Sequence, residues 1–378
     1  MQLSVIILNY NVRYFLELCV LSVQNALQNI DAEIIVIDNN SQDDSCEMMK
    51  QRFPNIKLIE NKENTGFPKG NNIGVSQAKG EYICILNPDT VVAEDTFTKV
   101  LAFAKKQKNL GIIGCKLIDG TGNFLPESKR GTPTPFVAFT KIAGLYKIFP
   151  KAFGKYYAQH LSENESGKVQ ILVGAFMLMK RDLYDEIGGF DENCFMYSDD
   201  IDLSYMTLKK GKSNYYFHET SIIHYKGEST VKDGIYMKRN QQAMNFFFEK
   251  HFRVSFFFTI FMKIGIVFFS LVKMFQGKPK PKSNPDNYIL ISNDEILKEK
   301  LEKQLNKTVE MQDVSYSFMK NSTSTEIIFD QNYLNFKTII NALEANRYKE
   351  FTFKIIPKSS RFMLGSNSSF DRGEVIEI

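Results

Sequence analysis

The segment Leu86-Asn87-Pro88-Asp89-Thr90 carries residue types that could hold a divalent cation. It ends an apolar run of strand length, so the Asp89 carboxylate and the Asn87 amide can face one point beyond that strand. Mg²⁺ and Mn²⁺ prefer oxygen ligands and often combine one or two carboxylates with substrate phosphates. Such an ion could neutralise the charge that develops on a nucleotide diphosphate leaving group. Alone, the turn is a weak indication, since Asp89 could instead cap a helix near residue 94.

Three other polar loops follow strand-like runs in the first half of the chain. They contain Asn9-Tyr10-Asn11, Asp38-Asn39-Asn40-Ser41 and the stretch from Asn61 to Asn72. Turns and helix caps favour the same residue types. Ligands of α/β proteins, however, bind at the carboxyl ends of parallel strands. Four such loops on one sheet edge therefore favour a binding site there.

The elements that must position these loops alternate between strand and helix. Apolar, mostly β-branched runs of strand length cover residues 3–9, 33–38, 56–60, 81–86 and 111–118. Amphipathic segments cover about 13–28, 43–51, 68–79, 94–108 and 200–210. This alternation predicts an α/β fold with a mainly parallel sheet covered on both faces. The irregular, Pro- and aromatic-rich stretch 126–168 is typical of a binding loop.

Composition excludes several classes of protein. With 378 residues, 43% hydrophobic and 24% charged, the chain can form two globular domains. A net charge of +4 is too small to indicate nucleic acid as a partner. The five cysteines are scattered without metal-ligand spacing, so we expect small buried thiols. No signal peptide precedes the first strand-like run, so we expect the active part of the protein to function in a reducing compartment.

Five blocks of sequence together resemble family 2 glycosyltransferases of the GT-A fold. The blocks are Val5 to Asn11, Ile35 to Ser41, Asn64 to Asn72, Leu86 to Asp89, and Gly188 to Leu203. The rhamnosyltransferase-like branch of bacterial surface polysaccharide enzymes is the most similar, and the agreement covers about residues 1–245. The resemblance implies a GT-A fold, a Rossmann-like mixed sheet, followed here by a small C-terminal α/β domain.

The resemblance also implies which residues bind a nucleotide-diphosphate sugar. Asp38 would accept a hydrogen bond from a uracil or thymine N3–H, because a carboxylate only accepts; it could also cap the next helix. Gly66 and the Asn71-Asn72 amides would let donors approach the ribose and diphosphate at a helix N-terminus. The complete set of expected nucleotide-sugar residues is Asn9, Asp38, Asn40, Gly66, Phe67, Asn71, Asn72 and Asn87.

Asp200 is the expected catalytic base, with Asp199 beside it. Inversion at an anomeric carbon requires a carboxylate that takes the proton of the acceptor hydroxyl. The family usually has Glu-Asp at this place, whereas this chain has Asp199-Asp200, and the register assigns the base to Asp200. The alternative is that the acids of Ser198-Asp199-Asp200-Ile201-Asp202 only favour a helix N-terminus. Both roles are compatible.

The same resemblance implies a metal site for Mg²⁺ or Mn²⁺. Asp89 would be the direct ligand, with Asn87 contributing nearby. His224 begins a segment, His224 to Ser229, that matches the family's His-x-x-Gly-x-Ser segment, and could be a third ligand. A structural histidine is the alternative. Lys226 could offset phosphate charge or be solvated.

Residues 246–283 combine an aromatic, apolar run with basic residues. Seven Lys/Arg accompany one Glu between residues 246 and 282, which favours an anionic membrane surface. The run 256–272 is short for a spanning helix and contains Lys263, so an interfacial helix is preferred over a span, with a buried core helix as the alternative. We therefore expect a location at the cytoplasmic face of the inner membrane, peripheral or single-span. In residues 284–378, strand-like runs at 288–291, 325–329 and 351–356 alternate with helical patterns near 294–306 and 335–347. This alternation predicts a small Rossmann-like domain without GxGxxG, to which no chemistry is assigned.

These observations predict an inverting, metal-dependent transferase. It would move one sugar, with rhamnose favoured, from a dTDP- or UDP-sugar to a lipid-linked glycan acceptor. Processive synthases of this fold carry Gln-x-x-Arg-Trp, and this chain has no Trp. One alternative is a sugar nucleotidyltransferase, which would show a Gly/Arg/Lys-rich phosphate loop near Val5 to Asn11. The other is a non-catalytic nucleotide-sugar-binding scaffold, which would need no base at Asp199 and Asp200.

Overall fold

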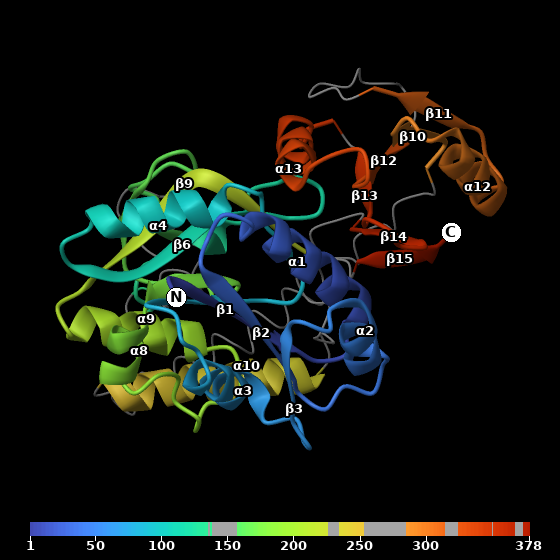
Figure 1. The fold of residues 1–378 in the computed structure, drawn as a ribbon. Coiled ribbons are helices and arrows are strands. Elements are labelled where there is room, and N and C mark those ends of the chain that lie inside the picture. Colours follow the sequence, from blue (N-terminus) through green and yellow to red (C-terminus); the bar gives the residue numbers. More distant parts are fainter. Residues whose placement is uncertain are drawn as a thin grey trace.

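The part of the chain that the structure describes folds around two β-sheets, one of nine strands and one of six (Figure 1). The computed structural model describes residues 1–134, 137, 157–225, 234–252, 285–313, 324–349, 351–366 and 373–378, and for 234–241 the backbone only. The nine-stranded sheet lies in the first part of the chain and the six-stranded sheet in the last. An α/β fold with a small second C-terminal sheet, as expected, is confirmed.

The larger sheet has the order β3-β2-β1-β4-β8-β6-β9-β5, and β7 pairs with β9. Its strands are β1 (Leu3–Asn9), β2 (Ala32–Asp38), β3 (Lys57–Glu60), β4 (Tyr82–Leu86), β5 (Thr90–Val91), β6 (Leu110–Ile118), β7 (Gly167–Val169), β8 (Phe176–Lys180) and β9 (Ser213–His224). The first four are parallel to one another. Strand β8 runs antiparallel to both β4 and β6, so the sheet is mixed. The parallel half carries the four polar loops predicted from the sequence.

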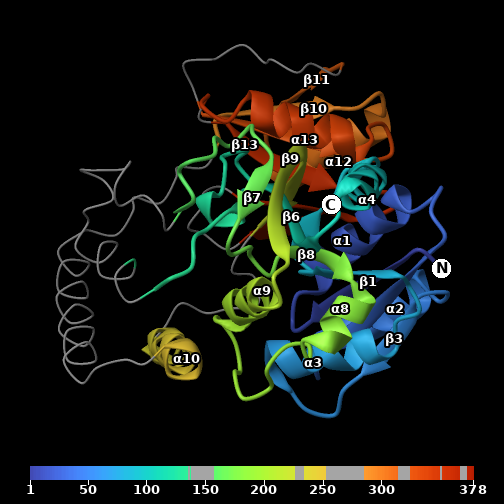
Figure 2. The same cartoon turned by 90° about the vertical axis from the view of Figure 1, so that its left-hand side faces the viewer.

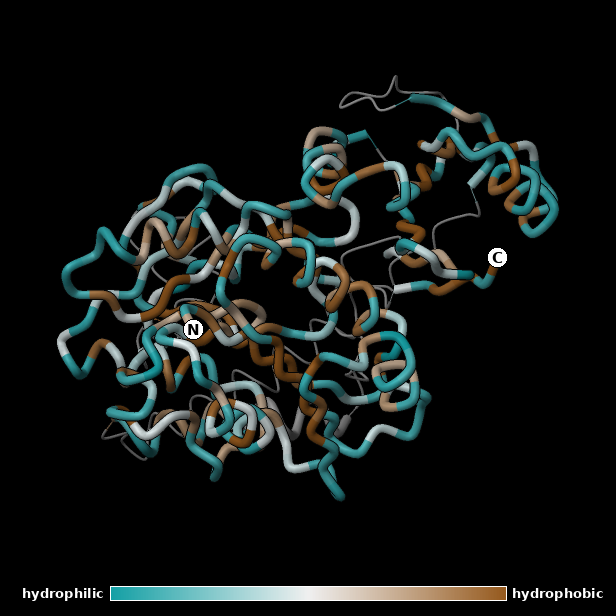
Figure 3. Tube along the Cα trace, in the orientation of Figure 1, coloured by the Kyte–Doolittle hydropathy of each residue, from teal (hydrophilic) through white to brown (hydrophobic). Residues whose placement is uncertain are grey.

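Helices cover both faces of this sheet. They are α1 (Arg13–Ala26), α2 (Ser45–Arg52), α3 (Gly66–Ser76), α4 (Thr96–Lys106), α8 (Arg181–Glu186), α9 (Asp199–Lys209) and α10 (Gly234–His251), with a 3-10 turn η1 (Pro126–Ser128). Alternate residues of β1 face opposite sides, as the period of a strand requires. Val5 and Ile7 pack with α1, α2 and α4, whereas Ile6 and Leu8 pack with α3, α8 and α9. Figure 3 shows the hydrophobic residues gathered in the central strands.

The C-terminal sheet has the order β11-β10-β12-β13-β14-β15. Its elements are β10 (Asn287–Ile291), α12 (Glu295–Leu305), β11 (Val309–Gln312), β12 (Thr325–Asp330), α13 (Phe336–Ala345), β13 (Thr352–Ile356), β14 (Phe362–Gly365) and β15 (Glu374–Glu377). The first four strands of this order are parallel, and β14 and β15 continue the sheet antiparallel. The sequence predicted β10, β12 and β13 but did not predict β11, β14 or β15.

One apolar cluster joins the two sheets. Phe15 and Leu18 of α1 and Tyr225 after β9 belong to the same buried cluster as Phe336 of α13 and Phe353 of β13. Figure 2 shows α13 lying beside β9 of the larger sheet. The C-terminal sheet is therefore packed onto the first through a common core and is not suspended on a linker.

Polar contacts fasten the same interface. Both oxygens of Glu94, which precedes α4, accept backbone N–H groups at the start of α13, from Phe336 at 2.7 Å and Lys337 at 2.8 Å. Glu94 thus satisfies helix donors that have no intrahelical partner. Lys116 of β6 is buried and lies 2.5 Å from Glu344 of α13.

The predicted domain limits 1–245, 246–283 and 284–378 remain a prediction. Helix α10 continues through residue 245 to His251. The apolar run 256–272 and the linker after it lie outside the described residues, so the expected membrane helix is not among the elements above. None of the helices in the described part of the chain is both long and apolar enough to cross a membrane.

Candidate active site

Asn9 and Asp38 lie side by side at the carboxyl ends of β1 and β2, where the parallel register pairs them. Asn9 Nδ2 donates to Asp38 Oδ2 at 2.8 Å, and the backbone N–H of Ser41 donates to Oδ1 at 2.8 Å. The buried carboxylate keeps further acceptor capacity, because each oxygen has two lone pairs. Asp38 does not cap the next helix, whose N-cap residue is Asp44.

Asn39, which the sequence did not single out, is the centre of a buried network behind this pair. Its Oδ1 accepts from Asn61 Nδ2 and from both the backbone N–H and the hydroxyl of Thr65. Its Nδ2 donates to Asn64 Oδ1 and to the carbonyl oxygen of Gly66. Asn39 therefore fixes the loop after β3 against the loop after β2. The neighbouring Asn40 is exposed, in the left-handed region with φ 65°.

Gly66 begins α3 and contacts the loop that leads to the expected base. Its φ is +80°, and a Cβ at this position would lie 2.8 Å from the carbonyl oxygen of Phe195. The backbone N–H of Phe67 donates to that same oxygen at 3.1 Å. The Phe67 ring packs edge-on against Phe190, with 5.6 Å between centroids. Only glycine allows this close approach in a left-handed conformation.

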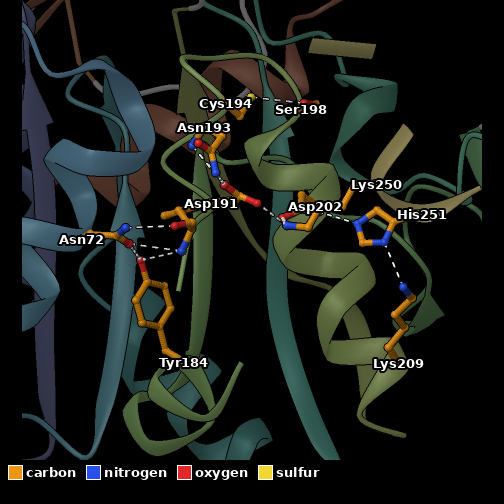
Figure 4. Close-up of polar contacts among 11 residues, drawn as sticks. Asn72, Tyr184, Asp191, Asn193, Cys194, Ser198, Asp202, Lys209, Lys250 and His251 are labelled. Atoms are coloured by element: carbon orange, nitrogen blue, oxygen red, sulfur yellow. Dashed lines mark hydrogen bonds and ion pairs between the residues drawn. The ribbon is translucent and has the colours of Figure 1, made fainter. Parts of the chain in front are cut away.

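Asn71 and Asn72 face different surroundings. Asn71 is buried and its Nδ2 donates to the carbonyl oxygen of Phe67 at 2.9 Å; its Oδ1 accepts no hydrogen bond from the described residues. Asn72 is committed to internal contacts: its Oδ1 accepts from Tyr184 Oη at 2.5 Å (Figure 4). The same oxygen accepts from the backbone N–H of Phe190, and Asn72 Nδ2 donates to Glu192. Asn72 thus positions the loop before α9, whereas Asn71 retains a buried acceptor.

Asn87, Asp89 and His224 converge because β5 pairs antiparallel with β9, placing Thr90 opposite His224. His224 Nε2 lies 3.4 Å from Asp89 Oδ1 and 3.4 Å from Asn87 Nδ2. Asn87 Oδ1, Asp89 Oδ1 and His224 Nδ1 are buried and form no hydrogen bond within the described part of the chain. Buried polar atoms normally have partners. A carboxylate and an amide, each with an unused oxygen, beside an imidazole fit a divalent cation of the Mg²⁺ or Mn²⁺ type.

The described residues contain no cluster of three or more His, Cys, Asp or Glu side chains suited to a metal. Asp89 and His224 form a pair, to which the amide of Asn87 adds a third side chain. Water and the phosphates of a substrate would have to supply the remaining ligands, as is usual for Mg²⁺. Lys226, the expected phosphate partner, lies outside the described residues.

Asp199 and Asp200 occupy the first turn of α9, where the helix dipole favours acids. Asp200 Oδ2 lies 2.5 Å from an Nη of Arg130 and accepts the backbone N–H of Gly174 at 3.1 Å. Asp199 Oδ1 accepts the backbone N–H of Asp200 at 2.9 Å. Burial, and then the neighbouring Asp200 charge, raise the pKa of Asp199 to about 7. The pair therefore combines Asp200, whose carboxylate is bound to the Arg130 guanidinium, with Asp199, which holds its proton near neutral pH.

Asp202, the third acid of this turn, faces away from Arg130 towards α10. Lys250 Nζ lies 2.8 Å from Asp202 Oδ2 and 2.6 Å from Asp191 Oδ2. His251 Nε2 lies 2.5 Å from Asp202 Oδ1, and Lys209 Nζ lies 3.0 Å from His251 Nδ1 (Figure 4). Asp202 therefore anchors α10, which leads into residues 246–283. Asp202, Asp191 and Lys250 border a cavity of about 370 Å³ together with Asn72 and Gly189.

Comparison with known proteins gives one family. The model of "Glycosyl transferase family 2" matches residues 4–188, which include the loops after β1, β2, β3 and β4. The resemblance expected from the sequence blocks and the GT-A fold class are both confirmed.

Individual relatives are similar over part of their length. The chain is 27% identical over 212 residues to an N-acetylglucosaminyl-diphospho-decaprenol L-rhamnosyltransferase of Mycobacterium tuberculosis, covering 53% of this chain and 68% of the relative. It is 25% identical over 215 residues to the low-salt glycan biosynthesis hexosyltransferase Agl10 of Haloferax volcanii, covering 55% and 62%. A solved mannosyltransferase of Pyrobaculum calidifontis, in complex with GDP-Man and Mn²⁺, matches with a TM-score of 0.47 and 19% identity over 67% of this chain and 65% of that one.

Proposed function

We propose that this chain, whose residues 4–188 belong to glycosyl transferase family 2, moves a single sugar from a nucleotide-diphosphate donor to a lipid-linked glycan acceptor. The observation that carries the proposal is the arrangement at one sheet edge: Asn9 hydrogen-bonded to Asp38, Asp89 beside His224, and Asp200 at the start of α9. Rhamnose is the favoured sugar, and a dTDP- or UDP-sugar the favoured donor, since the similar mycobacterial relative is an L-rhamnosyltransferase.

The donor's nucleotide would lie over the ends of β1 and β2. Asp38 is buried, is held by Asn9 and Ser41, and has acceptor capacity left for the N3–H of a uracil or thymine. The unsatisfied Oδ1 of Asn71, near the start of α3, could accept from a ribose hydroxyl. Asn72 is already committed to Tyr184 and Phe190. It would therefore shape the pocket and not touch the donor.

Asp89, His224 and Asn87 would hold the divalent cation. When bound, the cation supplies a positive charge that stabilises the departing nucleoside diphosphate. The protein's own contribution is a rigid site: Asp89 is held by the backbone bond from Tyr225 N–H to its carbonyl oxygen, at 3.0 Å. Thr90 Oγ1 likewise donates to the Asn87 carbonyl oxygen at 2.7 Å.

Asp200 would be the base of an inverting transfer. Its carboxylate takes the proton of the acceptor hydroxyl while that oxygen attacks the anomeric carbon. The bond from this carbon to the diphosphate oxygen breaks on the opposite face, so the configuration inverts. Asp199 keeps the pair from carrying two full charges, because its own pKa is raised to about 7.

The acceptor would be a glycan on a polyprenyl diphosphate. The named substrate of the mycobacterial relative, an N-acetylglucosaminyl-diphospho-decaprenol, supports this class. Helix α10 is fastened to α9 by Lys250 and His251, which belong to the basic, aromatic residues 246–283. A membrane-bound enzyme at the cytoplasmic face would thereby keep its base close to the lipid surface.

The experiment is a transfer assay with the full chain, Mn²⁺, a synthetic GlcNAc-diphosphate-polyprenol and a panel of dTDP-, UDP- and GDP-sugars. The product's anomeric configuration is read by NMR. We expect transfer of one sugar with inversion, loss of transfer in EDTA, and loss in Asp200→Asn with donor binding retained. Undiminished transfer by Asp200→Asn, or a retained configuration, would contradict the role of the base. Formation of nucleoside triphosphate and sugar 1-phosphate from the donor when inorganic diphosphate is added would indicate the sugar nucleotidyltransferase alternative instead.

A further inference from the structure

Arg130 is a charged side chain at the site for which the sequence suggested no role. It lies after η1, seventy residues from Asp200. One of its Nη atoms lies 2.5 Å from Asp200 Oδ2 and donates to the carbonyl oxygen of Leu172 at 3.0 Å. The side chains of Arg130 and Asp200 are 11% and 10% exposed, so the ion pair is largely shielded from water.

The backbone of Arg130 is fixed independently of its side chain. Its N–H donates to the carbonyl oxygen of Ile171, and the Ile171 N–H donates to the carbonyl oxygen of Arg130, each at 2.9 Å. Next to it, Lys129 Nζ reaches the carbonyl oxygen of Leu161 at 2.8 Å. The guanidinium is thus presented from a rigid segment, which is the condition for precise positioning of a catalytic group.

The contacts on Asp200 are confined to one oxygen. Arg130 and the Gly174 N–H both bind Oδ2. Within the described residues, Asp200 Oδ1 accepts no hydrogen bond. A carboxylate anchored through one oxygen cannot rotate freely about its Cβ–Cγ bond, so the other oxygen points in a constant direction. Oδ1 is then the atom available to an acceptor hydroxyl.

We propose that Arg130 is a positioning residue that, with the Gly174 N–H, anchors Asp200 through Oδ2 and leaves Oδ1 to receive the acceptor's proton. This inference rests on the proposed role of Asp200 as the base. It assigns Arg130 no contact with either substrate. Arg130 acts on turnover through Asp200, and its loss changes the rate of the chemical step and not the binding of the donor.

The kinetic test compares Arg130→Gln and Arg130→Lys with the unmodified chain, using the donor and acceptor found by the transfer assay. A misplacement of about 1 Å can cost about 100-fold in rate. We therefore expect kcat to fall about 100-fold in Arg130→Gln with donor KM unchanged, and to recover partly in Arg130→Lys. Arg347→Gln is the control, since Arg347 lies 2.7 Å from Glu163 in a more exposed ion pair away from the site.

Crystal structures of the same variants give a measurement that needs no substrate. Asp200 is expected to leave the Gly174 N–H in Arg130→Gln and to keep it in Arg130→Lys. An Asp200 side chain that stays in place in Arg130→Gln would overturn the proposal, as would an unchanged kcat. A raised donor KM with kcat retained would place Arg130 in donor binding and overturn it too. If Asp200→Asn is fully active, the proposed function's base is wrong; if Asp200→Asn is inactive while Arg130→Gln is fully active, only the positioning role is wrong.

Discussion

His224 Nε2 lies 3.4 Å from Asp89 Oδ1, at a place where β9 and β5 pair antiparallel. Both side chains are buried, and each has a polar atom without a hydrogen bond from the described residues. His224 Nε2 is hydrogen-bonded to Asn87 Nδ2, so the acceptors left unused at this point are Asp89 Oδ1 and Asn87 Oδ1. Their unused state is the observation that most favours a cation at this point.

Asp89→Asn and His224→Ala should therefore weaken cation binding. Loss of a charged ligand removes the main attraction, and even outer-shell changes at metal sites cost about 10- to 100-fold in affinity. We expect the apparent Kd for Mn²⁺, measured by calorimetry with nucleoside diphosphate present, to rise by at least about 10-fold in each variant. Glu186→Gln, an exposed carboxylate at the end of α8, is the control. Equal Mn²⁺ affinity in Asp89→Asn and in the control would contradict the site.

The raised pKa of Asp199 predicts that the free energy of unfolding of the protein depends on pH. Its pKa in the folded protein is raised to about 7, first by burial and then by Asp200, above the value of about 3.9 in an unfolded chain. The folded state therefore binds the proton more tightly, and this contribution is complete below about pH 4 and is lost as pH rises through about 7. The loss of stability is on the order of 1 kcal/mol for each pH unit in that window.

Asp199→Asn removes this titration while keeping an oxygen for the Asp200 N–H. We expect the variant to gain stability relative to the unmodified chain as pH rises from 5 to 8, as measured by urea unfolding. The exposed carboxylate of Asp185 serves as the control, in Asp185→Asn. A stability difference that is constant from pH 5 to 8 would show that Asp199 is ionised throughout.

Asn39→Ala should disorganise the loops that carry the donor-side residues. The substitution removes the acceptor of the partly buried Thr65 N–H and of Asn61 Nδ2, and the donor to the buried carbonyl oxygen of Gly66. Each unsatisfied buried group costs about 1–3 kcal/mol. We expect a fall in unfolding free energy of at least about 2 kcal/mol and weaker binding of UDP or dTDP by calorimetry. Gln42→Ala, at an exposed position of the same loop, is the matched control. Similar losses in both variants would mean that the network around Asn39 contributes nothing particular.

Glu94→Gln should loosen the contact between the two sheets. The carboxylate accepts two N–H groups at the start of α13, where the helix dipole also favours a negative charge. Loss of such a cap costs about 0.5–2 kcal/mol. We expect a decrease of this size in urea unfolding. Glu295→Gln, in the first turn of α12, is the control, and a larger effect there would contradict the role of Glu94.

The sequence predicted those parts of the fold in which burial of an element produces a recognisable pattern of apolar residues along the chain. Strands β1, β2 and β4 are buried on both faces, so they appear as continuous apolar runs, and the polar residues that follow them, such as Asp38 and Asp89, were identified at once. Strand β8 was not recognised as the antiparallel partner of β4. The residues of a five-residue apolar run are the same whether the strand pairs parallel or antiparallel, so the direction could not be predicted.

Contacts between distant residues could not be predicted in the same way. His224 meets Asn87 across 137 residues and Arg130 meets Asp200 across 70. The family resemblance suggested the first of these and not the second. The Asn39 network was missed because an asparagine in a loop has the same local signature whether it makes one hydrogen bond or five.

The common apolar cluster of Phe15, Tyr225, Phe336 and Phe353 makes the last ninety residues inseparable from the first part of the chain. Tyr225 directly follows His224, so the tail's core is contiguous with the side of the site where a cation would lie. The C-terminal sheet is accordingly not an interchangeable module: a tail taken from another transferase would have to match the outer face of α1 side chain by side chain. Sequence changes in the two parts would have to accumulate together.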